Sequence, residues 1–241
     1  AVGRTALNSN TTGTANTAIG LDALFTNTTG FSNTAVGVAA NKLNTTGNDN
    51  SSLGLYALLY NSTGAANTAV GSNALFNNTT ASGATAVGYQ AAYSNTTGTE
   101  LVALGYQAGY TNATGTVLTA LGYQALYSTN GATQNVGVGH RAGYAVTTGS
   151  YNTTVGVNSL RFTTTGGYNT AVGGDALFSN TTASDNTAIG YQAAYSNSTG
   201  TRNVAVGRDA LHEVLLNDNT GVGYRAGYLT TSGQYNTSLG S

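Results

Sequence analysis

A dipeptide of one aliphatic residue followed by glycine recurs along the whole chain at an interval of 17 residues. The only step that differs is one of 16 residues, between Gly207 and Gly223. These anchor glycines are Gly3, Gly20, Gly37, Gly54, Gly71, Gly88, Gly105, Gly122, Gly139, Gly156, Gly173, Gly190, Gly207, Gly223 and Gly240. Repetition at a fixed period is the signature of an architecture in which each repeat packs on its neighbours. Because this period is too short for a propeller blade or a pair of helices, it predicts one coil of a solenoid per repeat.

The repeat reads N-T-A-V-G-x-x-A-L-[YF]-x-N-T-T-G-x-x. Its N-T-A-V segment alternates with period two and is rich in Thr and Val, which predicts a short strand. In such a strand Thr34 and Val36 share one face, while Asn33 and Ala35 share the other. The apolar cluster Ala-Leu-Phe at 23–25 predicts a return strand, and the Gly-x-x and N-T-T-G stretches predict the two turns.

The residue before the anchor glycine is always Val, Ile or Leu, and the residue before that is always small. Such constancy indicates packing in a space of fixed size. A single coil buries too little apolar surface to offset the ordering of its backbone, whereas stacked coils share hydrogen bonds and seal each other's cores. We therefore expect an all-β fold, a parallel β-solenoid or β-roll of about fourteen 17-residue coils, as one continuous array over residues 1–241. Since neither end carries a capping sequence, we expect a segment or unit of a longer fibre.

The composition argues against several classes of function. Only 6% of the residues are charged and the net charge is −1, so there is no basic field for nucleic acid and no polybasic patch for a membrane. No apolar run approaches the roughly 20 residues that cross a bilayer, and the lack of cysteine removes disulfides and thiolate metal sites. His140 and His212 lie in different repeats and the acidic residues are scattered. We therefore expect no catalytic pair, no metal and no cofactor, and an enzyme is the least favoured class.

Two columns of aromatic residues follow the repeat. The first lies five residues after the anchor glycine, and we expect its rings to stack and join successive coils. It consists of Phe25, Phe76, Tyr93, Tyr110, Tyr127, Tyr144, Phe178, Tyr195 and Tyr228. The second directly follows the anchor glycine and supplies the candidate surface or ligand contacts, Tyr89, Tyr106, Tyr123, Tyr191 and Tyr224. For this second column, stacking between coils and contact with sugars or a neighbouring fibre are both open.

Asparagine recurs four residues before the anchor glycine, as at Asn16 and Asn33, and predicts a ladder of stacked side-chain amides. Many N-x-[ST] triplets, including those at Asn27, Asn95 and Asn180, match the glycosylation signal. That motif follows trivially from an N-T-T-G turn, however, and glycans on successive coils would collide.

Two further features depart from or break the pattern. T-G-T occurs at 12–14, 97–99, 114–116 and 199–201 and suggests an ice-binding threonine array, but other coils carry residues such as Phe31 at the third position. The coil that includes 211–221 is one residue short and gains apolar side chains, which predicts a local bulge. Its Val214, Leu215 and Leu216 are the candidate lateral contact.

The strand motif is "NTAVG" at 33–37 and 67–71 and "NTAIG" at 16–20 and 186–190. It resembles the head repeat of trimeric autotransporter adhesins of the YadA type, in which an N-S-x-A-I-G-like strand precedes a turn and a small residue. The resemblance covers the whole chain as a pattern, although the period here is longer than that of a typical adhesin head coil. It implies a left-handed parallel β-roll, three chains packed side by side and presentation on a bacterial surface. Similar arrays resemble segments of bacteriophage tail fibres, which are also trimeric.

We therefore expect a structural and adhesive extracellular fibre segment, located at a cell surface or on a virion tail fibre. Its partners would be copies of itself, as a trimer or stacked end to end into filaments. The alternative is a tail-fibre shaft or glycan-binding module that contacts surface glycans or a host receptor. An ice-binding solenoid is a more remote alternative.

Overall fold

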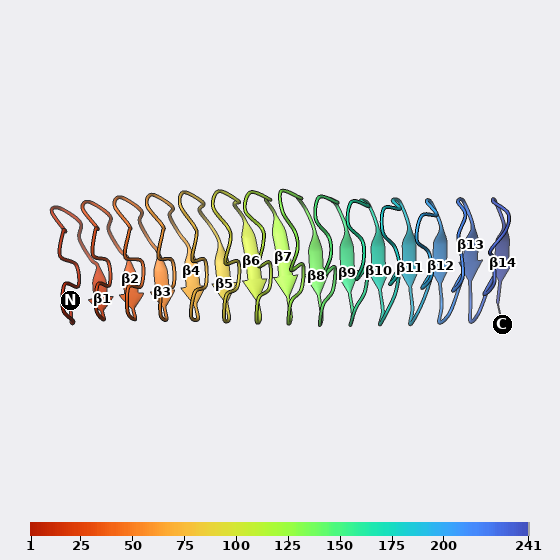
Figure 1. Ribbon diagram of the computed structural model, residues 1–241, viewed down its shortest axis with the longest axis horizontal. Coiled ribbons are helices and arrows are strands. Elements are labelled where there is room, and N and C mark those ends of the chain that lie inside the picture. Colours follow the sequence, from red (N-terminus) through yellow and green to blue (C-terminus); the bar gives the residue numbers. More distant parts are fainter. Residues whose placement is uncertain (241) are drawn as a thin grey trace. The chain divides into compact units, whose positions relative to one another are not determined.

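The computed structural model describes residues 1–240 and is an all-β parallel solenoid, with no helix in that range (Figure 1). It comprises two compact units, called unit 1 (Ala1–Leu118) and unit 2 (from Thr119 onward). Unit 1 contains β1 (Thr17–Ile19), β2 (Thr34–Val36), β3 (Ser51–Leu53), β4 (Thr68–Val70), β5 (Thr85–Val87) and β6 (Leu101–Leu104). β7 (Leu118–Leu121) begins at the last residue of unit 1. Unit 2 continues with β8 (Val136–Val138), β9 (Thr153–Val155), β10 (Thr170–Val172), β11 (Thr187–Ile189), β12 (Val204–Val206), β13 (Thr220–Val222) and β14 (Thr237–Leu239).

Within each unit, consecutive strands pair in parallel and lie side by side in sequence order (Figure 1). The register follows the sequence period, because Ala18 of β1 lies opposite Ala35 of β2. The 16-residue step does not disturb this register, since Ala205 of β12 still lies opposite Gly221 of β13. The missing residue is therefore taken out of the connecting segment. The predicted solenoid and its period are confirmed.

The two faces of each strand differ as the alternation predicts. Asn33 and Ala35 are buried, whereas Thr34 and Val36 lie on the outer face of the coil. The strict aliphatic column consequently faces outward, and Leu53 is 51% exposed. The expectation that this column packs in a space of fixed size is wrong within the single chain. Alanine fills the interior side of the strand instead, together with buried side chains from the opposite part of the coil.

The cluster at 23–25 does not form the predicted return strand. Asp22 and Leu24 have φ values of 57° and 50°, in the left-handed region that no extended strand contains. Their backbone groups still pair between coils, because the Asp22 N–H donates to the Arg4 carbonyl (3.1 Å) and the Leu24 N–H to the Ala40 carbonyl (3.1 Å). The segment is thus a hydrogen-bonded turn in which left-handed residues alternate with others.

The anchor glycines are required by the close approach of successive coils. Gly71 has a φ of 130°, and a Cβ built on it would lie 2.5 Å from the carbonyl oxygen of Gly88. No side chain fits at that distance, and L residues rarely adopt that φ. The constant glycine therefore sets the spacing at which coils stack.

The interior of each coil is narrow and holds mainly alanine and leucine. In unit 1, Ala18, Ala23, Leu24, Ala35 and Ala40 form one buried cluster. In unit 2, some leucines rely on glycines of the following coil, because a Cβ on Gly137 would lie 2.7 Å from Leu126 Cγ. Core volume is therefore shared between neighbouring coils as well as within each one.

Candidate functional site

Within residues 1–240, no three His, Asp or Glu side chains come close enough together to hold a metal ion. The part of the chain that the structure describes also contains no helix long and apolar enough to cross a bilayer. Two surfaces carry recurring exposed side chains and are the candidate sites, an outer apolar strip, which includes the tyrosine column, and the turns.

The outer strip consists of the two columns of side chains on either side of the anchor glycines. In unit 1 it comprises Val2, Ile19, Val36, Leu53, Val70, Val87 and Leu104 before the glycines, and Arg4, Leu21, Val38, Leu55, Ser72, Tyr89 and Tyr106 after them. Leu53 and Leu104 are 51% and 49% exposed, and Leu55 and Tyr89 are exposed to a similar degree. Arg4 is the one charged residue among these fourteen positions of unit 1. In unit 2 the same two columns include His140 and Arg208, which interrupt their apolar character.

All five predicted tyrosines of the second column lie on the surface. Tyr89, Tyr106, Tyr123, Tyr191 and Tyr224 are each between 41% and 49% exposed. In unit 1, Tyr89 and Tyr106 stack with ring centroids 5.4 Å apart. In unit 2, the guanidinium group of Arg208 lies 5.8 Å from the centroid of the Tyr191 ring. The column therefore combines stacking between coils with exposed ring surface.

The first aromatic column stacks as predicted except at Phe25, where Lys42 Nζ lies 5.7 Å from the ring centroid. The rings of Phe76 and Tyr93 lie 5.0 Å apart with an interplanar angle of 6°, and Tyr93 and Tyr110 lie 5.2 Å apart. In unit 2 the stack includes a histidine, because His212 lies 5.1 Å from Tyr195 and 4.8 Å from Tyr228. These half-buried rings join neighbouring coils.

The predicted asparagine column, here called the strand ladder, is buried, but it mainly binds the backbone. Asn33 Nδ2 donates to the Gly47 carbonyl (2.8 Å), and Asn33 Oδ1 accepts from the Asn50 N–H (3.0 Å). Direct bonds between amides are fewer in this ladder, as between Asn169 Nδ2 and Asn152 Oδ1 (3.1 Å). Each amide thus ties the strand of one coil to the turn of the next.

A second ladder, here called the turn ladder, was not predicted. It uses the first residue of the N-T-T-G turn, and its amides bond each other directly, as from Asn44 Nδ2 to Asn27 Oδ1 (2.8 Å) and from Asn61 Nδ2 to Asn44 Oδ1 (3.0 Å). The recurrence of asparagine at a single position of that turn is the sequence signal for it. The same burial argues against glycosylation at Asn27, Asn95 and Asn180, since none of the three side chains is accessible.

The short coil does not form the predicted apolar bulge in full. Val214 is fully buried and stands where other coils place the turn-ladder asparagine, so it cannot be a lateral contact. Leu216 is half-buried, and its carbonyl accepts from Asn203 Nδ2 (2.9 Å) as the turn glycine does in other coils. Leu215 is 43% exposed and is the one residue of the three that remains a candidate contact.

Some charged residues form small groups, such as Asp209 with Arg208 (3.4 Å) and Arg225 (3.7 Å). Arg202 contacts the Asp218 carboxylate with two nitrogens, Nε at 2.7 Å and Nη2 at 2.9 Å, and this hydrogen bonding lowers the pKa of Asp218. In unit 1, the Thr5 hydroxyl donates to Asp22, and Lys42 Nζ lies 3.0 Å from the same carboxylate, which lowers the pKa of Asp22. Both carboxylates already have partners, which makes them poor candidates for acid–base chemistry.

The T-G-T motifs lie on turns and not on the sheet. Thr12, Thr14 and Thr97 are exposed outside the strands. A column made mainly of threonines lies instead on the outer face of the strands, as at Thr17 and Thr34, beside the aliphatic column. No family model, no curated protein and no solved structure matches the chain.

Proposed function

We propose that the chain is a structural segment of an extracellular fibre that associates side by side with copies of itself through the outer strip. The observation that carries this proposal is that every repeat keeps an apolar residue at a position that the single chain leaves exposed to solvent. The column before the anchor glycine is Val, Ile or Leu in every repeat, yet Leu53 and Leu104 are about half exposed in the single chain. A contiguous exposed apolar surface is typical of an interaction site.

A second copy of the same chain fits this strip better than a globular partner does. Two solenoids built on one 17-residue period present side chains at the same spacing, so a contact made at one coil is repeated at the next. The strip of unit 1 carries one charge, at Arg4 in its first coil, and none between Ile19 and Tyr106 that would be desolvated in such a contact. Lateral packing would also cover the aliphatic column and supply the space of fixed size that its constancy indicates.

The mechanical part of the proposal rests on the hydrogen bonding between coils. Strand, turn and side-chain groups all pair with the next coil, as in the bonds from the Thr17 N–H to the Asn33 carbonyl (2.8 Å) and from the Thr28 N–H to the Thr45 carbonyl (3.0 Å). Such an array resists local opening because every coil is held on both sides. The resemblance to adhesin head repeats and tail-fibre arrays favours a location on a cell surface or virion, where the fibre would hold adhesive parts at a distance.

The test is the molar mass in solution of the wild-type chain and of two double variants. Leu53→Lys with Leu104→Lys places two charges in the outer strip of unit 1. Thr46→Lys with Thr97→Lys places two charges on exposed turn positions of the same unit as the matched control. We expect an oligomer for the wild type and the control and a monomer for the outer-strip variant, with the same circular dichroism for all three. A wild type that stays monomeric at high concentration would contradict the proposal.

A second candidate function is ice binding, favoured by the threonine column that flanks the aliphatic column on the outer strand face. A monomeric wild type that shows thermal hysteresis, lost in the Leu53→Lys, Leu104→Lys variant, would favour this candidate. An oligomer without hysteresis favours the fibre.

A further inference from the structure

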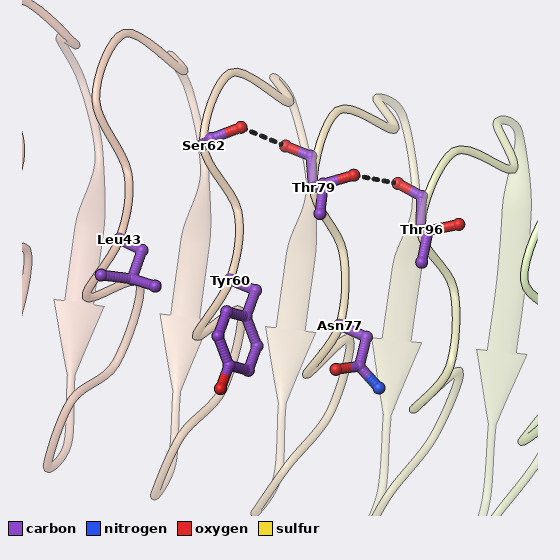
Figure 2. A pocket seen from close by; sticks show the side chains of 6 residues that line it. All are labelled: Leu43, Tyr60, Ser62, Asn77, Thr79 and Thr96. Atoms are coloured by element: carbon purple, nitrogen blue, oxygen red, sulfur yellow. Dashed lines mark hydrogen bonds between the residues drawn. The ribbon is translucent and has the colours of Figure 1, made fainter.

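A shallow cavity of about 430 Å³, largely open to solvent, lies on unit 1 and shares no lining residue with the outer strip. Two rows of side chains line it, one of Leu43, Tyr60 and Asn77 and one of Ser62, Thr79 and Thr96 (Figure 2). Each row runs along successive coils, with one residue from each coil. This volume lies within the roughly 300–1,000 Å³ of sites that bind small molecules.

The hydroxyl row presents acceptors to the cavity. The hydroxyls of Ser62, Thr79 and Thr96 donate their protons to the carbonyls of Thr79, Thr96 and Ala113, at 3.0, 3.1 and 2.9 Å. A hydroxyl has a single proton but two lone pairs, so each oxygen can still accept a hydrogen bond. A ligand seated against this row must therefore supply hydrogen-bond donors at several positions.

The opposite row supplies an aromatic ring and an amide. Tyr60 is 43% exposed, and its ring is held at 5.2 Å from the Phe76 ring in an edge-to-face contact of 80°. The Asn77 side-chain amide makes no hydrogen bond to any of residues 1–240, so both its donor and its acceptor are available. None of the six lining residues is charged.

We propose that this cavity binds a neutral saccharide. The hydroxyl groups of a sugar can donate hydrogen bonds to the free lone pairs of the Ser and Thr oxygens. The C–H face of a sugar ring can pack on the exposed aromatic ring. An apolar ligand would leave the free lone pairs of the hydroxyl row without donors, and a charged ligand would find no counter-charge among the lining residues. The site shares no residue with the outer strip, so this inference stands or falls independently of lateral association.

The experiment is saturation-transfer NMR on the full chain with cellohexaose, maltohexaose and chitohexaose as probes and a heparin hexasaccharide as the charged comparison. The test variants are Tyr60→Leu, which removes the ring, and Asn77→Ala, which removes the amide. Tyr56→Leu is the matched control, because Tyr56 is also exposed and packs edge to face on Phe76, at 6.2 Å, but does not line the cavity. Tyr60→Phe keeps the ring and removes only the hydroxyl group, so it separates the loss of the ring from a general effect of a substitution at this position.

We expect at least one neutral oligosaccharide to bind, and we expect its affinity to fall about tenfold in Tyr60→Leu and in Asn77→Ala, with little change in Tyr56→Leu and Tyr60→Phe. Binding of no neutral probe up to about 10 mM, which corresponds to less than about 3 kcal/mol, would overturn the proposal. Binding that survives Tyr60→Leu, or binding of the heparin hexasaccharide alone, would overturn it as well.

Discussion

The two units use the two asparagine ladders in opposite ways. In unit 1 the turn ladder is continuous from Asn10 to Asn95, whereas the strand ladder ends at Asn67 and its column continues with Ala84 and Leu101. In unit 2 the strand ladder is continuous from Asn135 to Asn236, whereas the column of the turn ladder contains residues such as Val146 and Val214. Each unit thus contains one unbroken ladder of asparagine side chains, and the column of its other ladder accommodates apolar residues.

The largest expected effect comes from breaking a continuous ladder. Asn61→Ala in unit 1 removes the donations of Nδ2 to Asn44 Oδ1 and the Gly64 carbonyl, and it leaves Asn78 Nδ2 without Asn61 Oδ1. Because the site is fully buried, we expect a loss of about 3 kcal/mol in the free energy of unfolding. Val214→Ala, in the same column of unit 2, removes only apolar contacts and should cost about 1–2 kcal/mol. Urea denaturation followed by circular dichroism measures both, and equal losses would show that the ladder has no special role.

A second contrast concerns packing in unit 2, where leucine is accommodated by glycine. Gly137→Ala would place a Cβ against Leu126 Cγ, and we expect it to destabilise the chain by about 1–3 kcal/mol. Shortening the opposing side chain should relieve this overlap. The double variant Gly137→Ala, Leu126→Ala should therefore lose less than the sum of the two single losses. Strict additivity in the same denaturation assay would mean that the two sites do not share volume.

A buried asparagine outside both ladders provides a third contrast, with the asparagines inside them. Asn41 in unit 1 is fully buried, and neither its Nδ2 nor its Oδ1 has a partner. The neighbouring coils place Leu24 and Leu58 there, with φ values of 50° and 55°, so the backbone accepts leucine. We expect Asn41→Leu to raise the free energy of unfolding by about 1 kcal/mol, because it removes an unpaired buried amide. A lower unfolding midpoint than wild type would refute this.

The smallest effect is the pH dependence of the ion pairs. The folded pKa of Asp218 lies below its unfolded value near 3.8, so its pairing with Arg202 stabilises unit 2 above that pH. This contribution should disappear as the pH falls through the folded pKa. Thermal melting of the wild type and of Asp218→Asn between pH 7 and pH 2 checks the sign, and the difference between them should shrink at low pH. A difference that grows instead would contradict the assignment. Asp22 in unit 1 should behave in the same direction.

The period and the strands could be predicted from the sequence because they depend on local alternation and on constant spacing. The inner face could not, since Ala35 and Val36 are both apolar and only the narrowness of the coil decides that alanine goes inside. The prediction of a return strand was wrong because the backbone at Leu24 is left-handed. Leucine rarely adopts that conformation, so the residue type gives no sign of it. The prediction of a bulge in the short coil was wrong for Val214. The loss of one residue leaves the register of the strands unchanged, and Val214 occupies a buried position.

Of the candidate surfaces, one could be predicted from the sequence and the other could be predicted only in part. Exposure of Tyr89 and the other tyrosines of its column follows from their place beside the anchor glycine. The cavity proposed to bind a saccharide depends on residues of neighbouring coils. Its hydroxyl row occupies the first threonine position of the N-T-T-G turn, whereas Tyr60 and Asn77 occupy a variable position, so the consensus predicts the hydroxyls but not the ring or the amide beside them.

The most direct test of the central claim is a cryo-EM structure of the wild-type assembly in solution. The account predicts two or more chains packed side by side, with Leu53 and Leu104 of one chain buried against another copy. Chains that meet only at their ends, with these leucines facing solvent along the whole filament, would contradict it.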